Sequence, residues 1–165
     1  MPTSEIHIVR ANDHHVDDLG QLLERIEAED HPDEPAKARA AGDGLQRSLQ
    51  HFPVLQSACV WALIAYVGDT PAGLAVLARV PKLDARRGFL YLDELHVLEP
   101  YRRRGVGTAL LKEGFALAKE LGLAGVRLLT RIDNEPARRL YEAAGFEGQE
   151  SVFYLRYLDR PEARV

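Results

Sequence analysis

A glycine turn preceded by three arginines offers the clearest chemistry in this sequence. Its residues are Arg102, Arg103, Arg104, Gly105, Val106, Gly107 and Thr108. Glycines let successive backbone N–H groups turn inward, and a helix N-terminus carries partial positive charge, so a strand, glycine turn and helix in this order can bind phosphate. A Rossmann turn would need a third glycine where Leu110 stands, and a P-loop would need a lysine after Gly107. Neither a nicotinamide dinucleotide nor a nucleoside triphosphate is therefore the natural ligand.

The hydrophobic pattern predicts the elements that position this turn. Strands are expected over 4–10, 58–67, 72–80, 88–98, 125–130 and 151–158, and helices from Asn12 or Asp13 onward, over 36–50, over 105–121 and from Asn134 to before Gly145. The strands 58–67 and 72–80 are almost continuously apolar, which predicts burial on both faces. The order βααβββαβαβ predicts one α/β domain with a mixed sheet, spanning residues 1–165.

Composition excludes several classes of protein. The chain has 165 residues, 46% of them hydrophobic, and a net charge of −4, which argues against general nucleic-acid binding. It shows neither an apolar run long enough to span a membrane nor the apolar region of a signal peptide, so a cytoplasmic protein without a membrane partner is expected. Cys59 is the only cysteine, and the histidines have no metal-ligand spacing, so no metal site is expected.

Two segments together resemble the GNAT family, the Gcn5-related N-acetyltransferases. The first is Arg102-x-x-Gly105-x-Gly107, which follows the strand end "LHVLEPY". The second is "NEPARRLYEAAGF", which is similar to the family's Asn-x-x-Ala-x-x-x-Tyr-x-x-x-Gly-Phe segment from Asn134 to Phe146. The order of elements agrees with the family over nearly the whole chain. The resemblance implies an acetyl-CoA-dependent N-acetyltransferase, and it makes a homodimer plausible.

The resemblance also implies where acetyl-CoA binds. Backbone amides from Arg103 through Thr108 would hold the pyrophosphate, and Arg102 and Arg104 would add charge. The pantetheine arm would lie between the strands "YLDELHV" and "VRLLT", which splay apart in this family, and it would meet the backbone of Leu95 and Val97. The resemblance further places Asn134 at the pantetheine and Arg138 near the nucleotide. Arg103 departs from the family, because glycine is usual at this position, and the departure affects the implied binding little if its side chain points to solvent.

Acetyl transfer to an amine needs a base for the ammonium and an acid for the leaving thiolate. Tyr141 is the candidate acid, since a phenol can donate a proton and this tyrosine stands in the second segment. Asp93 is the first candidate for the base, followed by Glu94 and His96. Strand alternation predicts Asp93 on the face of Leu95 and Val97, and Glu94 on the face of His96. Ion pairs with neighbouring arginines, or a base replaced by water chains, remain the alternatives for the two acids.

The acceptor is expected to be a small cationic amine such as a polyamine. From Asp13 to Glu34 the chain has nine acidic residues and one basic residue, and in this family the first two helices border the acceptor site. The candidate acids there are Glu27, Glu29, Asp30, Asp33 and Glu34. A solvated acidic surface is the alternative interpretation. A peptide or protein N-acetyltransferase and a CoA-binding regulatory module without turnover are the competing functions.

Overall fold

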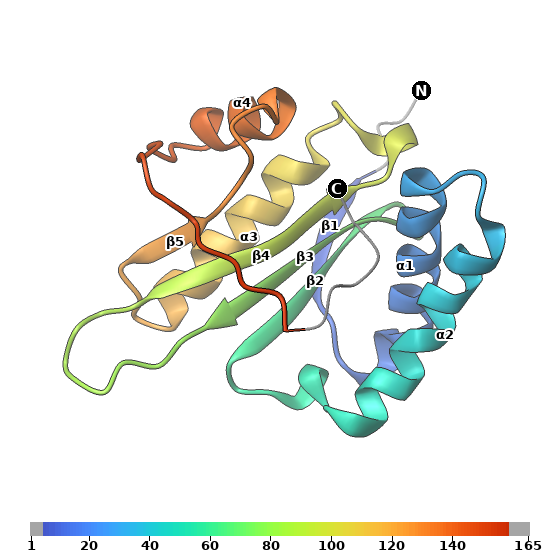
Figure 1. The fold of residues 1–165 in the computed structure, drawn as a ribbon, viewed down its shortest axis with the longest axis horizontal. Helices are drawn as coiled ribbons and strands as arrows, with labels where there is room; N and C mark the ends of the chain where they lie inside the picture. The colour runs from blue at the N-terminus through green and yellow to red at the C-terminus, as the bar shows by residue number, and fades with distance from the viewer. Residues whose placement is uncertain (1–4, 159–165) are drawn as a thin grey trace.

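The structure is a computed structural model that describes residues 5–158 (Figure 1). The strands are β1 Ile6–Arg10, β2 Val60–Val67, β3 Thr70–Arg79, β4 Phe89–Val97 and β5 Gly125–Leu128. The helices are α1 Val16–Asp30, α2 Pro35–His51, α3 Val106–Glu120 and α4 Glu135–Ala143. A 3-10 turn precedes α1, and the side chain of Asn12 caps it by accepting a hydrogen bond from the backbone N–H of His14.

The five strands form one mixed sheet in the order β1-β2-β3-β4-β5. Neighbouring strands are antiparallel except β4 and β5, which are parallel because α3 connects them. This arrangement confirms the predicted α/β class and places the glycine turn directly after β4, at the start of α3.

Helices cover both faces of the sheet, because β2 and β3 carry apolar side chains in both phases of the pleat. Leu63 of β2 packs with the cluster that contains Leu110 and Leu117 of α3. The next residue, Ile64, belongs to a second cluster with Leu22 of α1. These strands are therefore buried on both faces, as predicted. Helix α3 packs on one face of the sheet, and α1, with α2 packed against it, lies on the other (Figure 1).

The predicted final strand over 151–158 is wrong. This stretch has no regular secondary structure, and all of its side chains are exposed, including Phe153 at 69% and Tyr154 at 87%. In Figure 1 it passes in front of β4 as an irregular ribbon. Its aromatic and β-branched residues favour extended backbone, but a strand is stable only where an edge supplies hydrogen bonds and neighbours to pack on, and the sequence pattern does not specify that edge.

Within residues 5–158, no helix is long and apolar enough to cross a membrane. No group of three or more His, Cys, Asp or Glu side chains in the same range is placed to hold a metal ion.

Candidate functional site

The glycine turn has the backbone that its sequence predicts. Gly105 has φ of 86° and is the residue before α3, so the turn needs a residue without a Cβ at this position. Arg103 also has positive φ, at 62°, and no other non-glycine residue among those described does. Its side chain is exposed. The left-handed backbone explains why glycine would suit position 103, and it means that the arginine is held there under strain.

This strain predicts that the protein is more stable with glycine than with alanine at position 103, which is the reverse of the usual order in a helix. The free energy of unfolding of Arg103→Gly should be about 1 kcal/mol higher than that of Arg103→Ala, because only alanine keeps a Cβ in the left-handed region. Chemical denaturation of the two variants measures the difference. At the exposed helical residue Lys112 the same pair should show the opposite sign. An alanine variant as stable as the glycine variant at position 103 would contradict the strained turn.

A cleft of about 800 Å³ opens beside the turn and contains most of the predicted cosubstrate-binding residues. Its lining residues are Leu95, His96, Val97, Tyr101, Arg102, Arg103, Gly105, Val106, Gly107, Thr108, Asn134, Pro136, Ala137, Arg139, Leu140 and Tyr141. The end of β4, the glycine turn and α4 therefore meet around one cavity, although the first and last of these residues are far apart in the sequence.

The end of β4 presents to this cleft backbone groups that have no strand partner. Pairing between β4 and β5 covers only Phe89–Leu92 against Gly125–Leu128, so β4 has no strand partner on that side further along. The N–H of Leu98 donates to the carbonyl of Ala72, at 3.0 Å, on the β3 side. Because successive residues of a strand direct their polar groups to opposite edges, those of Leu95 and Val97 face the open edge. Pairing thus ends at Leu92, where β5 ends, while β4 continues to Val97.

A β-bulge interrupts the strand at the two acids. Val76 pairs with Glu94 and Leu77 pairs with Leu92, which leaves Asp93 as the extra residue of β4. A bulge shifts the alternation by one residue, so Leu92 and Leu95 pack on the same α3-side cluster although an odd number separates them. Strict alternation, on which the predicted face of Asp93 depends, is therefore broken between Leu92 and Leu95, and both acids are exposed at the bulge.

Electrostatics distinguish the two carboxylates. Desolvation and the neighbouring charge of Asp93 raise the pKa of Glu94, and the charge of His96 opposes part of that shift. No ion pair involves Asp93 or Glu94 within the described part of the chain, so the alternative in which arginines neutralise them is not what the structure contains. The pair leaves negative charge beside the open edge of β4.

Tyr141 lies in the cleft wall with its ring partly buried. It packs against the α3-side core and meets Phe146 edge to face, with 5.7 Å between ring centroids. Burial raises the pKa of its phenol, so the hydroxyl keeps its proton throughout the neutral range. A protonated phenol facing the cleft is able to donate to an anion that forms there.

Arg102 and Arg104, which the resemblance placed at the pyrophosphate, contact other groups of the protein in this structure. Arg102 lines the cleft, but its guanidinium donates to the carbonyl of Val97 and to Glu29. The guanidinium of Arg104 lies over the ring of Tyr101, 5.6 Å from its centroid. Neither Arg104 nor Arg138 lines the cleft.

On α4, Arg139 lines the cleft, and Arg138 bonds to the carbonyl of Ile132 and pairs with Glu142. Arg139 was not among the residues predicted from the sequence. Helical phase relative to Tyr141 does not point to it, because Arg138 is three residues from Tyr141 and shares its face, whereas Arg139 is two residues away and does not. Asn134 lines the cleft and caps α4, since its side-chain oxygen accepts from the N–H of Ala137 at 3.4 Å.

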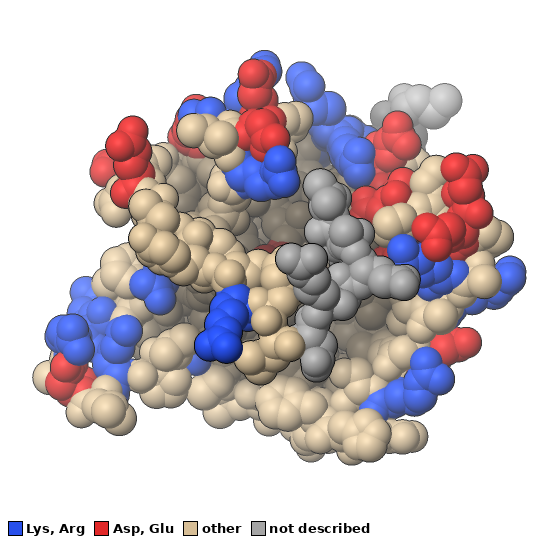
Figure 2. Space-filling model, viewed as in Figure 1, with Lys and Arg blue, Asp and Glu red and all other residues tan. Residues whose placement is uncertain are grey.

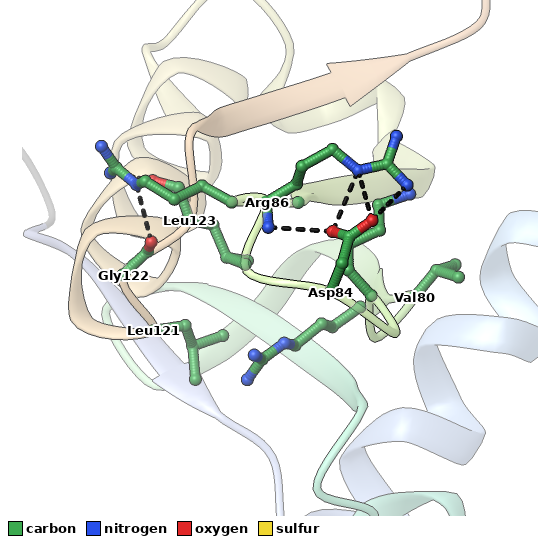
Figure 3. A pocket seen from close by; sticks show the side chains of 10 residues that line it. Val80, Asp84, Arg86, Leu121, Gly122 and Leu123 are labelled. Atoms are coloured by element: carbon green, nitrogen blue, oxygen red, sulfur yellow. Dashed lines mark hydrogen bonds and ion pairs between the residues drawn. The ribbon is translucent and has the colours of Figure 1, made fainter.

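A second, smaller pocket of about 180 Å³ collects the remaining basic residues of the segment from Arg79 to Arg104 (Figure 3). There Arg86 bonds to Asp84, and Arg87 donates to the carbonyls of Gly122 and Leu123 just beyond α3. The basic residues between Arg79 and Arg104 thus form two groups, one at each end of β4. Arg87 supports a helix C-terminus, where a cation is favourable.

Comparison with known proteins identifies the family of this chain. The family model described as the Acetyltransferase (GNAT) family matches residues 17–146. The chain belongs to the GNAT family. Members of this family are N-acetyltransferases that use acetyl-CoA as cosubstrate, so the predicted enzyme class and cosubstrate are confirmed at the level of the family.

Several curated relatives are similar to this GNAT chain. GCN5-related N-acetyltransferase 7 of Arabidopsis thaliana is 32% identical over 122 residues, 73% of this chain and 41% of that protein. Aminoglycoside N(6')-acetyltransferase type 1 of Acinetobacter genomosp. 13 is 30% identical over 117 residues, 68% of this chain and 75% of that protein. An N-alpha-acetyltransferase of Sulfurisphaera tokodaii is 40% identical over 92 residues, 55% of this chain and 53% of that protein. The chain thus spans less than half of the Arabidopsis protein.

Solved structures confirm the GNAT fold. An integron cassette protein from the V. cholerae mobile metagenome superposes with a TM-score of 0.77 at 22% identity, and 93% of each chain is covered. The aminoglycoside acetyltransferase AAC(6')-Iy, bound to a bisubstrate analog of CoA and acetylneamine, gives a TM-score of 0.69 at 22% identity over 93% of this chain and 99% of that one.

Proposed function

We propose that this GNAT protein transfers the acetyl group of acetyl-CoA to a primary amine of a small polycationic acceptor. The amine attacks the thioester carbonyl directly, without an acyl-enzyme, and the thiolate leaves. The observation that carries the proposal is the cleft itself, which joins the phosphate-type turn, the open edge of β4 and Tyr141 around one cavity.

The cleft offers acetyl-CoA two sets of backbone groups. The amides of the turn from Arg103 to Thr108, at the N-terminus of α3, favour the pyrophosphate. The edge groups of Leu95 and Val97 can pair with the amides of the pantetheine arm as a further strand would. In this proposal the backbone provides most of the contacts, and Arg139, which also pairs with Glu135 at 2.6 Å, is the arginine of α4 that lines the cleft.

Glu94 and Tyr141 divide the proton transfers. Neither Asp93 nor Glu94 lines the cleft, but both directly precede Leu95, which does. The raised pKa of Glu94 suits a base, so we place Glu94 ahead of Asp93. His96 is already engaged with Glu29, at 3.3 Å, and is the weakest of the three candidates. Tyr141, protonated at neutral pH, donates its phenolic proton to the thiolate.

The unpaired carboxylates at the bulge are the main support for a cationic acceptor. Figure 2 shows acidic side chains over α1 and the α1–α2 connection, while basic side chains gather on the β3–β4 loop at the opposite end. Part of the acidic segment is already paired, however, because Glu27 and Glu34 both lie within ion-pair distance of Lys37. The relative named as an aminoglycoside acetyltransferase supports a polyamine-like acceptor. Asp93 and Glu94 therefore support a cationic acceptor more directly than the acidic segment does.

The acceptor class is tested by thiol release from acetyl-CoA with matched amines. We expect kcat/KM for a polyamine or an aminoglycoside to exceed that for a peptide N-terminus by at least about tenfold, since two unpaired carboxylates attract a second positive charge on the acceptor. The N-alpha-acetyltransferases among the relatives favour the opposite ranking. Activity on peptides alone would overturn the small-amine acceptor and leave the acetyltransferase chemistry intact.

The base is tested by the pH dependence of kcat/KM in Glu94→Gln. A base must be deprotonated, so the wild-type rate should fall as pH drops through the raised pKa of Glu94. Without this carboxylate the rate should drop by about tenfold to a hundredfold, and the acid-side fall should move to lower pH. Asp93→Asn serves as the comparison, and it should lower the pKa seen in the profile because it removes a neighbouring negative charge. A wild-type profile retained in Glu94→Gln would assign the base elsewhere.

A further inference from the structure

Hydrogen-bond donors from the cleft converge on one carboxylate of α1. Glu29 accepts from the backbone N–H of Glu99 at 2.8 Å through one oxygen. Its other oxygen lies 2.9 Å from Nη2 of Arg102 and 3.3 Å from Nε2 of His96. These donors come from the end of β4, which contains His96, and from the segment that joins β4 to the glycine turn, and the side chain of Glu29 is only 22% exposed.

The position of Glu29 is unfavourable for α1 alone. It lies in the last turn of the helix, which contains no basic residue. A carboxylate there meets the negative end of the helix dipole. Arg102, His96 and the backbone of Glu99 supply the contacts that compensate for this arrangement. The carboxylate therefore stabilises the end of β4 and the segment after it more than it stabilises α1.

Arg102 links Glu29 to the wall of the cleft. Its Nε donates to the carbonyl of Val97 at 2.8 Å, while its Nη2 is held by Glu29. The guanidinium therefore bridges α1 and the open edge of β4. The backbone of the same residue closes the 3-10 turn Glu99–Tyr101 by donating to the carbonyl of Glu99 at 3.2 Å. The next residue is Arg103, with its strained left-handed backbone.

We propose that Glu29 is a positioning residue for the acetyl-CoA cleft. It does not line the cleft itself. By fixing Arg102 and the N–H of Glu99, it holds the chain that enters the glycine turn, so the turn's amides and the Val97 carbonyl are in place before the cosubstrate arrives. Preorganisation of this kind reduces the ordering cost of binding. The inference rests on the proposed binding of acetyl-CoA and is independent of the acceptor.

The first test is the Kd for acetyl-CoA of Glu29→Gln, measured by calorimetry. Glutamine keeps an oxygen for the N–H of Glu99 but loses the charge that holds Arg102. We expect Kd to rise by about fivefold to tenfold, and KM for acetyl-CoA to rise with it while kcat changes less than about twofold. Glu27→Gln is the matched control, because Glu27 is a similarly covered carboxylate of α1, 16% exposed, that pairs with His31 and Lys37 instead. The control should bind acetyl-CoA as the wild type does.

A double-mutant cycle separates positioning from a loss of stability. If Glu29 acts through Arg102, then Glu29→Gln should have almost no further effect on Kd in an Arg102→Gln background. Additive effects, or the same Kd in wild type and Glu29→Gln, would overturn the inference. A wild-type protein that does not bind acetyl-CoA would instead overturn the proposed function, so the two failures are distinguishable.

Discussion

Tyr141→Phe is expected to lower kcat by one to two orders of magnitude and to leave the Kd for acetyl-CoA nearly unchanged. The substitution removes one hydroxyl from a ring that is otherwise held by Phe146 and the α3-side core, so the packing is retained. The leaving thiolate then lacks its proton donor, and general acid catalysis of this kind contributes about 10²–10⁴-fold. Steady-state thiol release gives kcat, and calorimetry gives the Kd.

The same substitution at an exposed tyrosine provides the control for this result. Tyr154 is 87% exposed and does not line the cleft, so Tyr154→Phe should leave kcat unchanged. An unchanged kcat in Tyr141→Phe would remove the phenol from the mechanism. A large rise in Kd together with the fall in kcat would mean that the hydroxyl binds the cosubstrate rather than the leaving group.

Gly107→Val is expected to abolish binding of acetyl-CoA. A Cβ at position 107 would lie 3.0 Å from Cδ2 of Leu140 and 3.7 Å from Cγ2 of Val97, so a branched side chain would have to separate the start of α3 from α4. The turn and both walls of the cleft would change together. Acetyl-CoA at a hundred times its Kd stabilises a protein that binds it by about 2.7 kcal/mol, and the variant should lose the corresponding rise in Tm.

Gly44→Val is the matched control, because Gly44 lies in α2 and a Cβ there has nothing within 4 Å. This variant should keep the wild-type rise in Tm on addition of acetyl-CoA. The comparison uses the shift caused by the ligand, so a change in the Tm of the free protein does not affect it. A full shift in Gly107→Val would show that acetyl-CoA binds away from the glycine turn.

Local sequence was sufficient for the parts of the site that depend on backbone conformation. Gly105 and Gly107 marked a turn between a strand and a helix, and the structure places them at the start of α3 with the backbone edge of β4 beside them. Turn chemistry and helix capping depend on neighbouring residues, as the cap formed by Asn134 also illustrates. These features could therefore be predicted before any packing was known.

Features that depend on distant partners could not be predicted in this way. The bulge at Asp93 follows from the pairing of β4 with β3, and it reverses the alternation that a strand pattern assumes. The partner of Arg102 is Glu29, 73 residues away in the chain, so an arginine expected at the pyrophosphate is instead fixed to α1. The strand expected over 151–158 lacked a specified edge for the same reason.

The most direct test of the proposed function is the mass of the amine after incubation with acetyl-CoA and the wild-type protein. We predict that a polyamine or an aminoglycoside gains one acetyl group per molecule of CoA released, that the protein itself carries no acetyl group, and that Tyr141→Phe forms the same product more slowly. Release of CoA without an acetylated amine, or an acetyl group found only on peptide acceptors, would contradict the proposed transfer to a small polycationic amine.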